Sequence, residues 1–410
     1  MSHFDQLLEK YAELAVKVGV NIEEGQTLQI NAPLVTAPLV RKVVKYAYQA
    51  GAKHVYIDWH DDEVTRTKYE LAPEEAFSEF PEWKVKGLED LAKNGGAVLS
   101  VIAPNPELLQ GIDPKRIATA NKTGATALHV YREYMMADKI RWSIVAVPCI
   151  EWAEKVYPNE TEEKAMELLW ESVFKICRVD KDNPIEAWNL HNNTLQEKVT
   201  QLNDKQYKTL LYKAPGTDLS LDLVDNHVWK GGGAFSEDGK WFNPNIPTEE
   251  VFSMPHSHGV NGKVTSTYPL NYGGNVIDKF SLTFENGSVV DYSAEVGYET
   301  LKHLLETDEG ARRLGEVALV PHDSPISNSG LVFYNTLFDE NASCHLALGK
   351  AYPNNMKDGE KLSSEEQAKL GINQSLTHVD FMIGSPELNI DGVKADGTIE
   401  PIMRNGNWAF

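Results

Sequence analysis

The sequence places a histidine and an aspartate two positions apart, a spacing that could bind a cation. His378 and Asp380 lie in residues 377–383, a short run typical of a β-strand. Side chains two positions apart in a strand project from the same face, so the two could share one ion. The alternative is a surface strand whose polar face carries both. The apolar residues at 381–383 favour a site, because a charge in apolar surroundings needs a partner or a metal.

Two glutamates stand next to other strand-like runs. Glu250 is the second of an adjacent pair with Glu249, in a proline-containing loop. We expect one carboxylate of the pair to face solvent and the other to point inward; the alternative is a solvated turn. Glu316 leads into the apolar run 317–320. It is a candidate ligand, and its alternatives are an edge charge or a salt-bridge partner.

Residues 331–353 bring a carboxylate, an imidazole and a phenol close together in sequence, at Glu340, His345 and Tyr352. The composition of this stretch is typical of a loop, and each of the three residues taken singly is interpreted as structural. His256 and His258 also have a metal-like H-x-H spacing. They lie in a segment that Pro and Gly mark as a loop, so we interpret them as structural.

Together these residues offer carboxylate oxygen and imidazole nitrogen without thiolate, the donor set suited to Zn²⁺, Mn²⁺ or Co²⁺. A pair of such ions can activate water and clamp both ends of a reacting bond. The metallopeptidase helix motif H-E-x-x-H is absent. Neither G-x-S-x-G nor a Gly-Ser-Cys-type nucleophile loop appears, so acyl transfer by Ser or Cys has no support in the sequence. Spacing alone leaves open whether the candidate ligands meet in space.

The first half of the chain alternates helical and strand-like runs. Helical spacing at 4–18 and 37–50 alternates with β-rich runs at 27–30, 54–57, 97–102 and 142–147. This βα alternation predicts an α/β domain with a largely parallel sheet. No G-x-G-x-x-G or Walker loop supports a nucleotide site there.

The second half changes to a period of two after helical runs at 161–176 and 184–202. Alternating runs occupy 219–223 and 280–284, and Asn286-Gly287 between the latter and 289–292 is a strong hairpin signal. We therefore predict an N-terminal α/β domain over 1–210. A mostly antiparallel α+β domain over 211–410 would carry the candidate ligands.

Composition excludes several classes of protein. The 410 residues carry 39 Lys and Arg against 60 Asp and Glu, a net charge of -21 that repels nucleic acid and anionic membranes. Cys149, Cys177 and Cys344 fit neither a zinc-knuckle spacing nor a disulfide framework, and we expect them to be buried thiols in a reducing cytoplasm. We expect no targeting segment and no membrane span.

Four separated motifs in order carry a family resemblance. They are residues 247–252, 315–320, 333–345 and 378–380. These motifs are similar to those of the aminopeptidase T, aminopeptidase S and PepS family of metalloaminopeptidases. The similarity runs from the N-terminal helix to the closing residues 404–408, so it covers essentially the whole chain.

The resemblance implies a bacterial cytoplasmic exopeptidase that acts on peptides with a free N-terminus. It further implies two divalent metal ions in the C-terminal domain and a homodimer that encloses the active sites. The family's ligand positions fall on Glu250, Glu316, His345, His378 and Asp380, and Glu340 lies in the matching segment as a ligand or behind one. Tyr352 matches a tyrosine at the metal centre, which could bind a metal or donate to the oxyanion.

The resemblance also suggests a mechanism. Two cations would lower the pKa of a bridging water and polarise the peptide carbonyl. Glu316 would bridge the ions, and one metal or a nearby carboxylate would hold the substrate's α-amino group. Two other classes remain as alternatives. A dinuclear phosphoesterase would need cationic groups for phosphate, and none clusters near the motifs; a non-catalytic α/β binding protein would need no metal.

Overall fold

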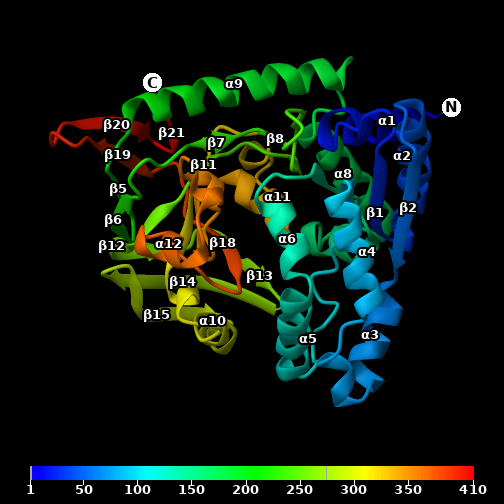
Figure 1. Cartoon of the computed structure of the whole chain (residues 1–410), viewed down its shortest axis with the longest axis horizontal. Helices are drawn as coiled ribbons and strands as arrows, with labels where there is room; N and C mark the ends of the chain where they lie inside the picture. The colour runs from blue at the N-terminus through cyan, green and yellow to red at the C-terminus, as the bar shows by residue number, and fades with distance from the viewer. Residues whose placement is uncertain (1, 274) are drawn as a thin grey trace. The chain divides into compact units, whose positions relative to one another are not determined.

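The computed structural model of the protein describes residues 2–273 and 275–410 (Figure 1). Contacts divide the chain into two compact units. The first consists of Met1–His191 and Gly233–Pro247, and the second of Asn192–Gly232 and Thr248–Phe410. The division into domains at 1–210 and 211–410 concerns regions that would fold independently, and it stays a prediction.

A five-stranded parallel sheet forms the centre of the first unit, as the βα alternation predicts. Its strand order is β10-β4-β3-β1-β2. The strands are β1 (Thr27–Pro33), β2 (His54–His60), β3 (Ala97–Ile102), β4 (Trp142–Ala146) and β10 (Asn245–Ile246). β10 is contributed by the returning segment Gly233–Pro247, which also holds the small hairpin of β8 (Ala234–Phe235) and β9 (Trp241–Phe242).

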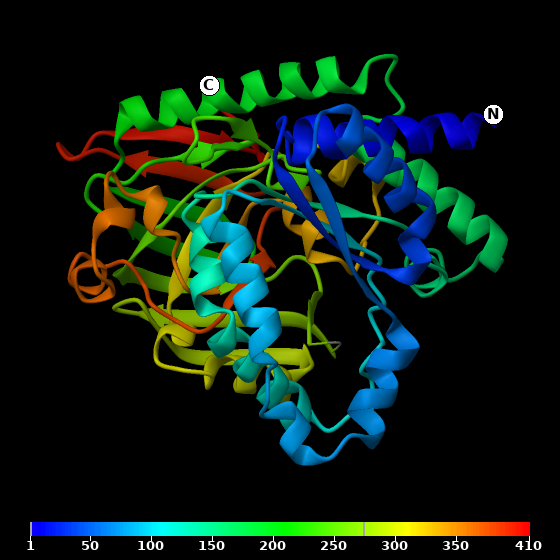
Figure 2. The same cartoon turned by 45° about the vertical axis from the view of Figure 1, so that its right-hand side comes forward.

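Helices pack against this sheet and against one another. A capping box between Ser2 and Asp5 starts α1, and α2 packs beside β1 and β2 (Figure 2). The helices of this unit are α1 (His3–Leu14), α2 (Ala37–Gln49), α3 (Asp62–Leu71), α4 (Glu82–Lys93), α5 (Pro114–Ala127), α6 (His129–Met136), α7 (Ile150–Val156) and α8 (Glu162–Ile176). α9 (Pro184–Lys205) begins in the first unit and ends in the second.

A nine-stranded antiparallel sheet is the larger of two sheets in the second unit. Its order is β13-β14-β12-β6-β5-β19-β20-β21, with β15 paired to β14. The hairpin predicted at Asn286-Gly287 is confirmed, because both residues have positive φ and Glu285 pairs with Ser288. The strands are β5 (Thr209–Ala214), β6 (Thr217–Leu223), β12 (Pro255–Thr265), β13 (Leu270–Tyr272), β14 (Asn275–Glu285), β15 (Ser288–Val296), β19 (Asn389–Val393), β20 (Ile399–Arg404) and β21 (Asn407–Trp408).

The second sheet of this unit is smaller and antiparallel, with the order β18-β17-β16-β11-β7. We call it the ligand sheet, because four of its strands carry or adjoin the candidate ligands. Its strands are β7 (Lys230–Gly231), β11 (Val251–Ser253), β16 (Leu314–Leu319), β17 (His345–Gly349) and β18 (His378–Met382). Three short helices complete the unit, α10 (Tyr298–Leu305), α11 (Thr336–Asp339) and α12 (Ser364–Lys369).

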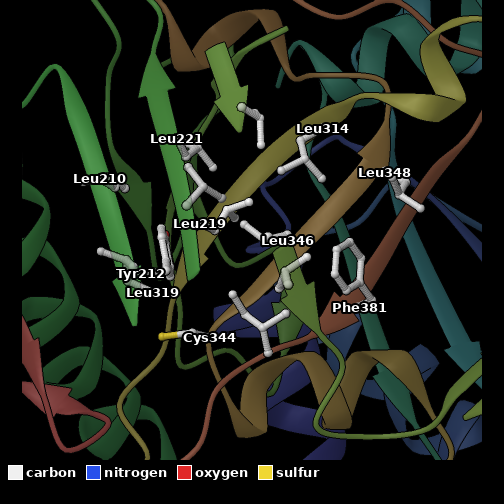
Figure 3. Close-up of a cluster of buried hydrophobic side chains, with 14 of the residues drawn as sticks. Leu210, Tyr212, Leu219, Leu221, Leu314, Leu319, Cys344, Leu346, Leu348 and Phe381 are labelled. Atoms are coloured by element: carbon white, nitrogen blue, oxygen red, sulfur yellow. The ribbon is translucent and has the colours of Figure 1, made fainter. Parts of the chain in front are cut away.

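One face of the ligand sheet belongs to the main hydrophobic core of the second unit. Leu346, Leu348 and Phe381 project into this core beside Leu219 and Leu221 of β6 (Figure 3). All are at most 2% exposed. Since side chains alternate along a strand, the residues between them must occupy the opposite face.

The structure also tests two smaller predictions. His256 and His258 lie in strand β12, so their assignment to a loop is wrong. The long-range pairing of β12 with β6 at Pro255 and Val260, on either side of these histidines, explains the error, because local Pro and Gly content does not report it. The three cysteines are free and buried, as expected. Among the described residues, no helix is long and apolar enough to cross a membrane.

The core face of the ligand sheet should contribute strongly to stability. Leu346→Ala should lower the free energy of unfolding by about 2–5 kcal/mol, because it leaves a cavity at a fully buried site. Urea denaturation measures this. As a control, Val290→Ala on β15, where the side chain is 52% exposed, should change stability by at most about 0.5 kcal/mol. Equal small losses in both variants would contradict the assignment of the core face.

Candidate metal centre

The face of the ligand sheet opposite the core gathers the candidate ligands. Cross-strand register places Glu316, Ala347 and Asp380 in one row, and Ala318 beside His345 in the next. His378 shares the face of Asp380, as predicted for residues two apart in a strand. Glu250 directly precedes β11, with the same alternation as Phe252, which pairs with Ala318. Three strands and the start of a fourth therefore bring together residues up to 130 positions apart in the sequence.

A β-bulge turns Glu316 onto this face. Leu314 pairs with Leu348, but Glu316 pairs with Ala347, so one extra residue is inserted between them. Without it, Glu316 would share the core face of Leu314. The extra residue is Gly315, where a Cβ atom would lie 2.3 Å from the carbonyl oxygen of Gly349. Only glycine fits at this bulge without moving the backbone.

Two groups of three side chains could each hold an ion, and Glu316 belongs to both. In the first group, Nε2 of His345 lies 3.1 Å from Oε2 of Glu250 and 3.5 Å from Oε1 of Glu316. In the second, Nε2 of His378 lies 3.6 Å from Oε2 of Glu316 and 3.5 Å from Oδ1 of Asp380. The two oxygens of one carboxylate thus face two different imidazoles.

Backbone carbonyls orient both imidazoles toward the carboxylates. Nδ1 of His345 lies 3.2 Å from the carbonyl oxygen of Ser343, and Nδ1 of His378 lies 2.7 Å from that of Lys350. A carbonyl only accepts, so each Nδ1 must carry the proton and donate it. In the neutral imidazole the lone pair is then on Nε2, the atom that faces the carboxylates. Metal-binding histidines are commonly oriented in this way.

The arrangement fits a cation. Two electron-rich atoms, Nε2 of His345 and Oε2 of Glu250, lie 3.1 Å apart and need a proton or a metal ion between them. Nε2 of His345 and Oδ1 of Asp380 are also buried without a hydrogen bond of acceptable geometry. Buried polar atoms are normally satisfied, so these two indicate a missing positive partner. The donor set is oxygen and nitrogen, which suits Zn²⁺, Co²⁺ or Mn²⁺.

Electrostatics in the metal-free cluster show the cost of collecting these charges. Burial raises the pKa of Glu316 to about 7, the nearby imidazole of His345 opposes the rise, and the charge of Asp380 adds to it. Burial alone would lower the pKa of His378, but Asp380 and Glu316 raise it to about 9. Burial would raise the pKa of Asp380, but His378 and His345 together lower it. When no metal is bound, protons held by these side chains therefore supply the positive charge that the cluster needs.

Glu340 and Tyr352 adjoin the cluster without belonging to either three-residue group. Glu340 is buried, and burial followed by the charges of Asp380 and Glu250 raises its pKa well above the usual value. Burial and the charge of Glu316 likewise raise the pKa of Tyr352. The Tyr352 ring stands edge-on to His378, with 4.8 Å between centroids. Its phenol therefore stays protonated and is able to donate a hydrogen bond.

Three features differ from the sequence-based expectations or escaped them. Glu249 and Glu250 are both buried, at 5% and 8% exposed, so the expectation that one faces solvent is wrong. His345 lies in a strand and not in a loop. Sequence reasoning missed Asp339 and Asn341, which are at most 1% exposed on either side of Glu340. The only signal for them was that each is next to the candidate ligand Glu340 in the sequence.

His256 and His258 do not join a metal group among the residues that the structure describes. Nδ1 of His258 instead lies 3.1 Å from Nη1 of Arg313, and the backbone N–H of His258 donates to Nδ1 of His256. Their structural interpretation is consistent with these contacts.

Comparisons with known proteins agree with this fold. The sequence matches the thermophilic metalloprotease (M29) family over residues 4–408. It is 62% identical to aminopeptidase 2 of Geobacillus stearothermophilus, over all of this chain and 99% of that protein. It is 56% identical to aminopeptidase AmpS of Bacillus subtilis over the full length of both. The solved structure of wild-type AmpT from Thermus thermophilus superimposes with a TM-score of 0.93 at 43% identity, over 99% of this chain and 100% of that one. The chain therefore belongs to the M29 family of thermophilic metalloproteases.

Proposed function

We propose that this chain releases the N-terminal residue of peptides with the help of two divalent metal ions bound on the ligand sheet. Membership of a metalloprotease family and full-length relatives that are named aminopeptidases make it a metal-dependent aminopeptidase. The dinuclear centre is supported by one observation above all. The two oxygens of Glu316 face His345 on one side and His378 on the other, which suits a carboxylate shared by two ions.

The proposed ligands divide into two sets around Glu316. Glu250 and His345 would hold one ion, and His378 and Asp380 the other. Glu340 is proposed as a further ligand, because its burial beside Asp380 and Glu250 is costly until a cation offsets the shared negative charge. Zn²⁺, Co²⁺ and Mn²⁺ all suit these donors.

Divalent ions held by these residues would supply two effects, a lower pKa for a bound water and polarisation of the peptide carbonyl. The chain's own residues supply the rest of the chemistry. Glu316 fixes the two ligand sets relative to each other. While it is protonated, the phenol of Tyr352 can donate a hydrogen bond to the oxyanion that develops on the carbonyl oxygen; to bind a metal instead, it would have to lose that proton. A carboxylate of the buried cluster, or one of the ions, would hold the substrate's free α-amino group, which limits cleavage to the first residue.

Two further features remain proposals that rest on the family resemblance. They are a homodimer that encloses the active sites and a cytoplasmic location. Of the alternative functions, a phosphoesterase is less favoured, because relatives that match this chain over its full length are named aminopeptidases.

Chelation should abolish peptide cleavage reversibly. Protein treated with a chelator should release no amino acid from short unblocked peptides, and added Zn²⁺, Co²⁺ or Mn²⁺ should restore release. N-acetylated versions of the same peptides should stay uncut, because they lack the α-amino group. Chromatography of the released amino acids measures both effects. Cleavage of acetylated peptides at the same rate would contradict an N-terminal specificity.

Glu316→Gln should reduce kcat/KM by more than about 100-fold, because it removes a proposed ligand of both ions. Losing a residue that only orients a metal ligand typically costs about 10–100-fold. The comparison uses initial rates on one unblocked peptide. Glu309→Gln, at a side chain that is 93% exposed, is the matched control and should leave the rate unchanged. A fully active Glu316→Gln variant is incompatible with the bridging role.

Metal binding should release protons and strengthen with pH. Glu316 and His378 have pKa values of about 7 and about 9 in the metal-free protein, so each holds a proton below that pH, and a cation must displace it. Zn²⁺ affinity should therefore rise between about pH 6 and pH 8. Calorimetry near neutral pH in two buffers of different ionisation enthalpy counts the protons. A binding enthalpy independent of the buffer would argue against this linkage.

A further inference from the structure

The side chain of Asn341 joins two segments that carry proposed ligands. Asn341 lies in the 3-10 turn Glu340–Ala342 and is fully buried, at 0% exposed. A buried amide must find hydrogen-bond partners on both its oxygen and its nitrogen. Both of its polar atoms do so, and their partners come from different parts of the second unit.

The oxygen of this amide fixes the backbone next to Glu250. Oδ1 of Asn341 accepts a 2.7 Å hydrogen bond from the backbone N–H of Glu249. The pairing of β11 with β16 begins only at Val251, so the ladder does not extend to this N–H. Asn341 therefore supplies a fixed point for the backbone immediately before a proposed ligand.

The nitrogen of the same amide fixes the segment that carries Glu340. Nδ2 donates to the carbonyl oxygen of Leu337 at 3.0 Å, and it lies 3.4 Å from Oε1 of Glu340. Asp339, which directly precedes this turn, accepts hydrogen bonds from the backbone N–H groups of Phe333 and Asn335. The Glu340 carboxylate thus lies beside a donor of its own turn.

We propose that Asn341 is a positioning residue that sets the geometry of Glu250 and Glu340 and thereby the metal affinity of the site. The inference rests on the proposed metal centre. Groups that orient metal ligands typically contribute a factor of about 10–100 to metal affinity. An amide suits this place, because it offers an acceptor to Glu249 and donors to Leu337 and Glu340 without adding charge to the cluster.

The test measures Zn²⁺ binding by the full-length chain in competition with a chromophoric chelator. Asn341→Leu keeps the side chain's approximate volume and removes its hydrogen bonds, so the Kd for Zn²⁺ should rise about 10–100-fold. Asn203→Leu is the matched control. Asn203 in α9 also donates to and accepts from one backbone segment, at Trp229, which is not a proposed ligand. This control should lower Tm in the presence of chelator but keep the wild-type Kd.

A second variant covers the case in which Asn341→Leu does not fold. Asn341→Asp keeps the size and the acceptor for Glu249, but it replaces the donor near Glu340 with an oxygen that repels the carboxylate. Its Kd should also rise. Wild-type Zn²⁺ affinity in either folded variant would overturn the positioning role and leave the metal centre standing. A wild-type chain that binds no Zn²⁺ would overturn the metal centre itself and this inference with it.

Discussion

The site depends on one constraint, the burial of several carboxylates around two imidazoles on one face of a small sheet. Burial disfavours each charge, and neighbouring carboxylates disfavour one another, so the cluster needs added positive charge. Protons can supply it, as the raised pKa of His378 shows, and divalent cations can replace those protons. Glu316 has the central place, because its two oxygens face different imidazoles.

The two faces of the ligand sheet have different roles, and the apolar packing of one face offsets the cost of burying charges on the other. One face packs Leu346 and Phe381 into the core, and it holds the backbone of all the strands that carry ligands. The opposite face can then carry charges at fixed spacing, with Ala347 between Glu316 and Asp380. The bulge at Gly315 serves both faces. It places Leu314 on the core face and Glu316, two residues later, on the ligand face, although residues two apart in a regular strand share one face.

Part of the fold and of the candidate site follows from local sequence. The rest depends on contacts between residues that are far apart in the sequence. The period of two places His378 and Asp380 on one face, and βα alternation predicts the parallel sheet. The burial of Glu249 and the strand around His345 depend on partners far away in the sequence, which local spacing does not report. The same holds for β10, which joins the parallel sheet about 100 residues after β4, its neighbour there.

The most direct test of the central claim is anomalous X-ray diffraction from crystals grown with Zn²⁺, measured on both sides of the zinc absorption edge. The account predicts two anomalous peaks in each chain. One should contact Glu250 and His345, the other His378 and Asp380, and both should contact Glu316. A single peak, or two peaks that do not share Glu316, would contradict a dinuclear centre built around that carboxylate.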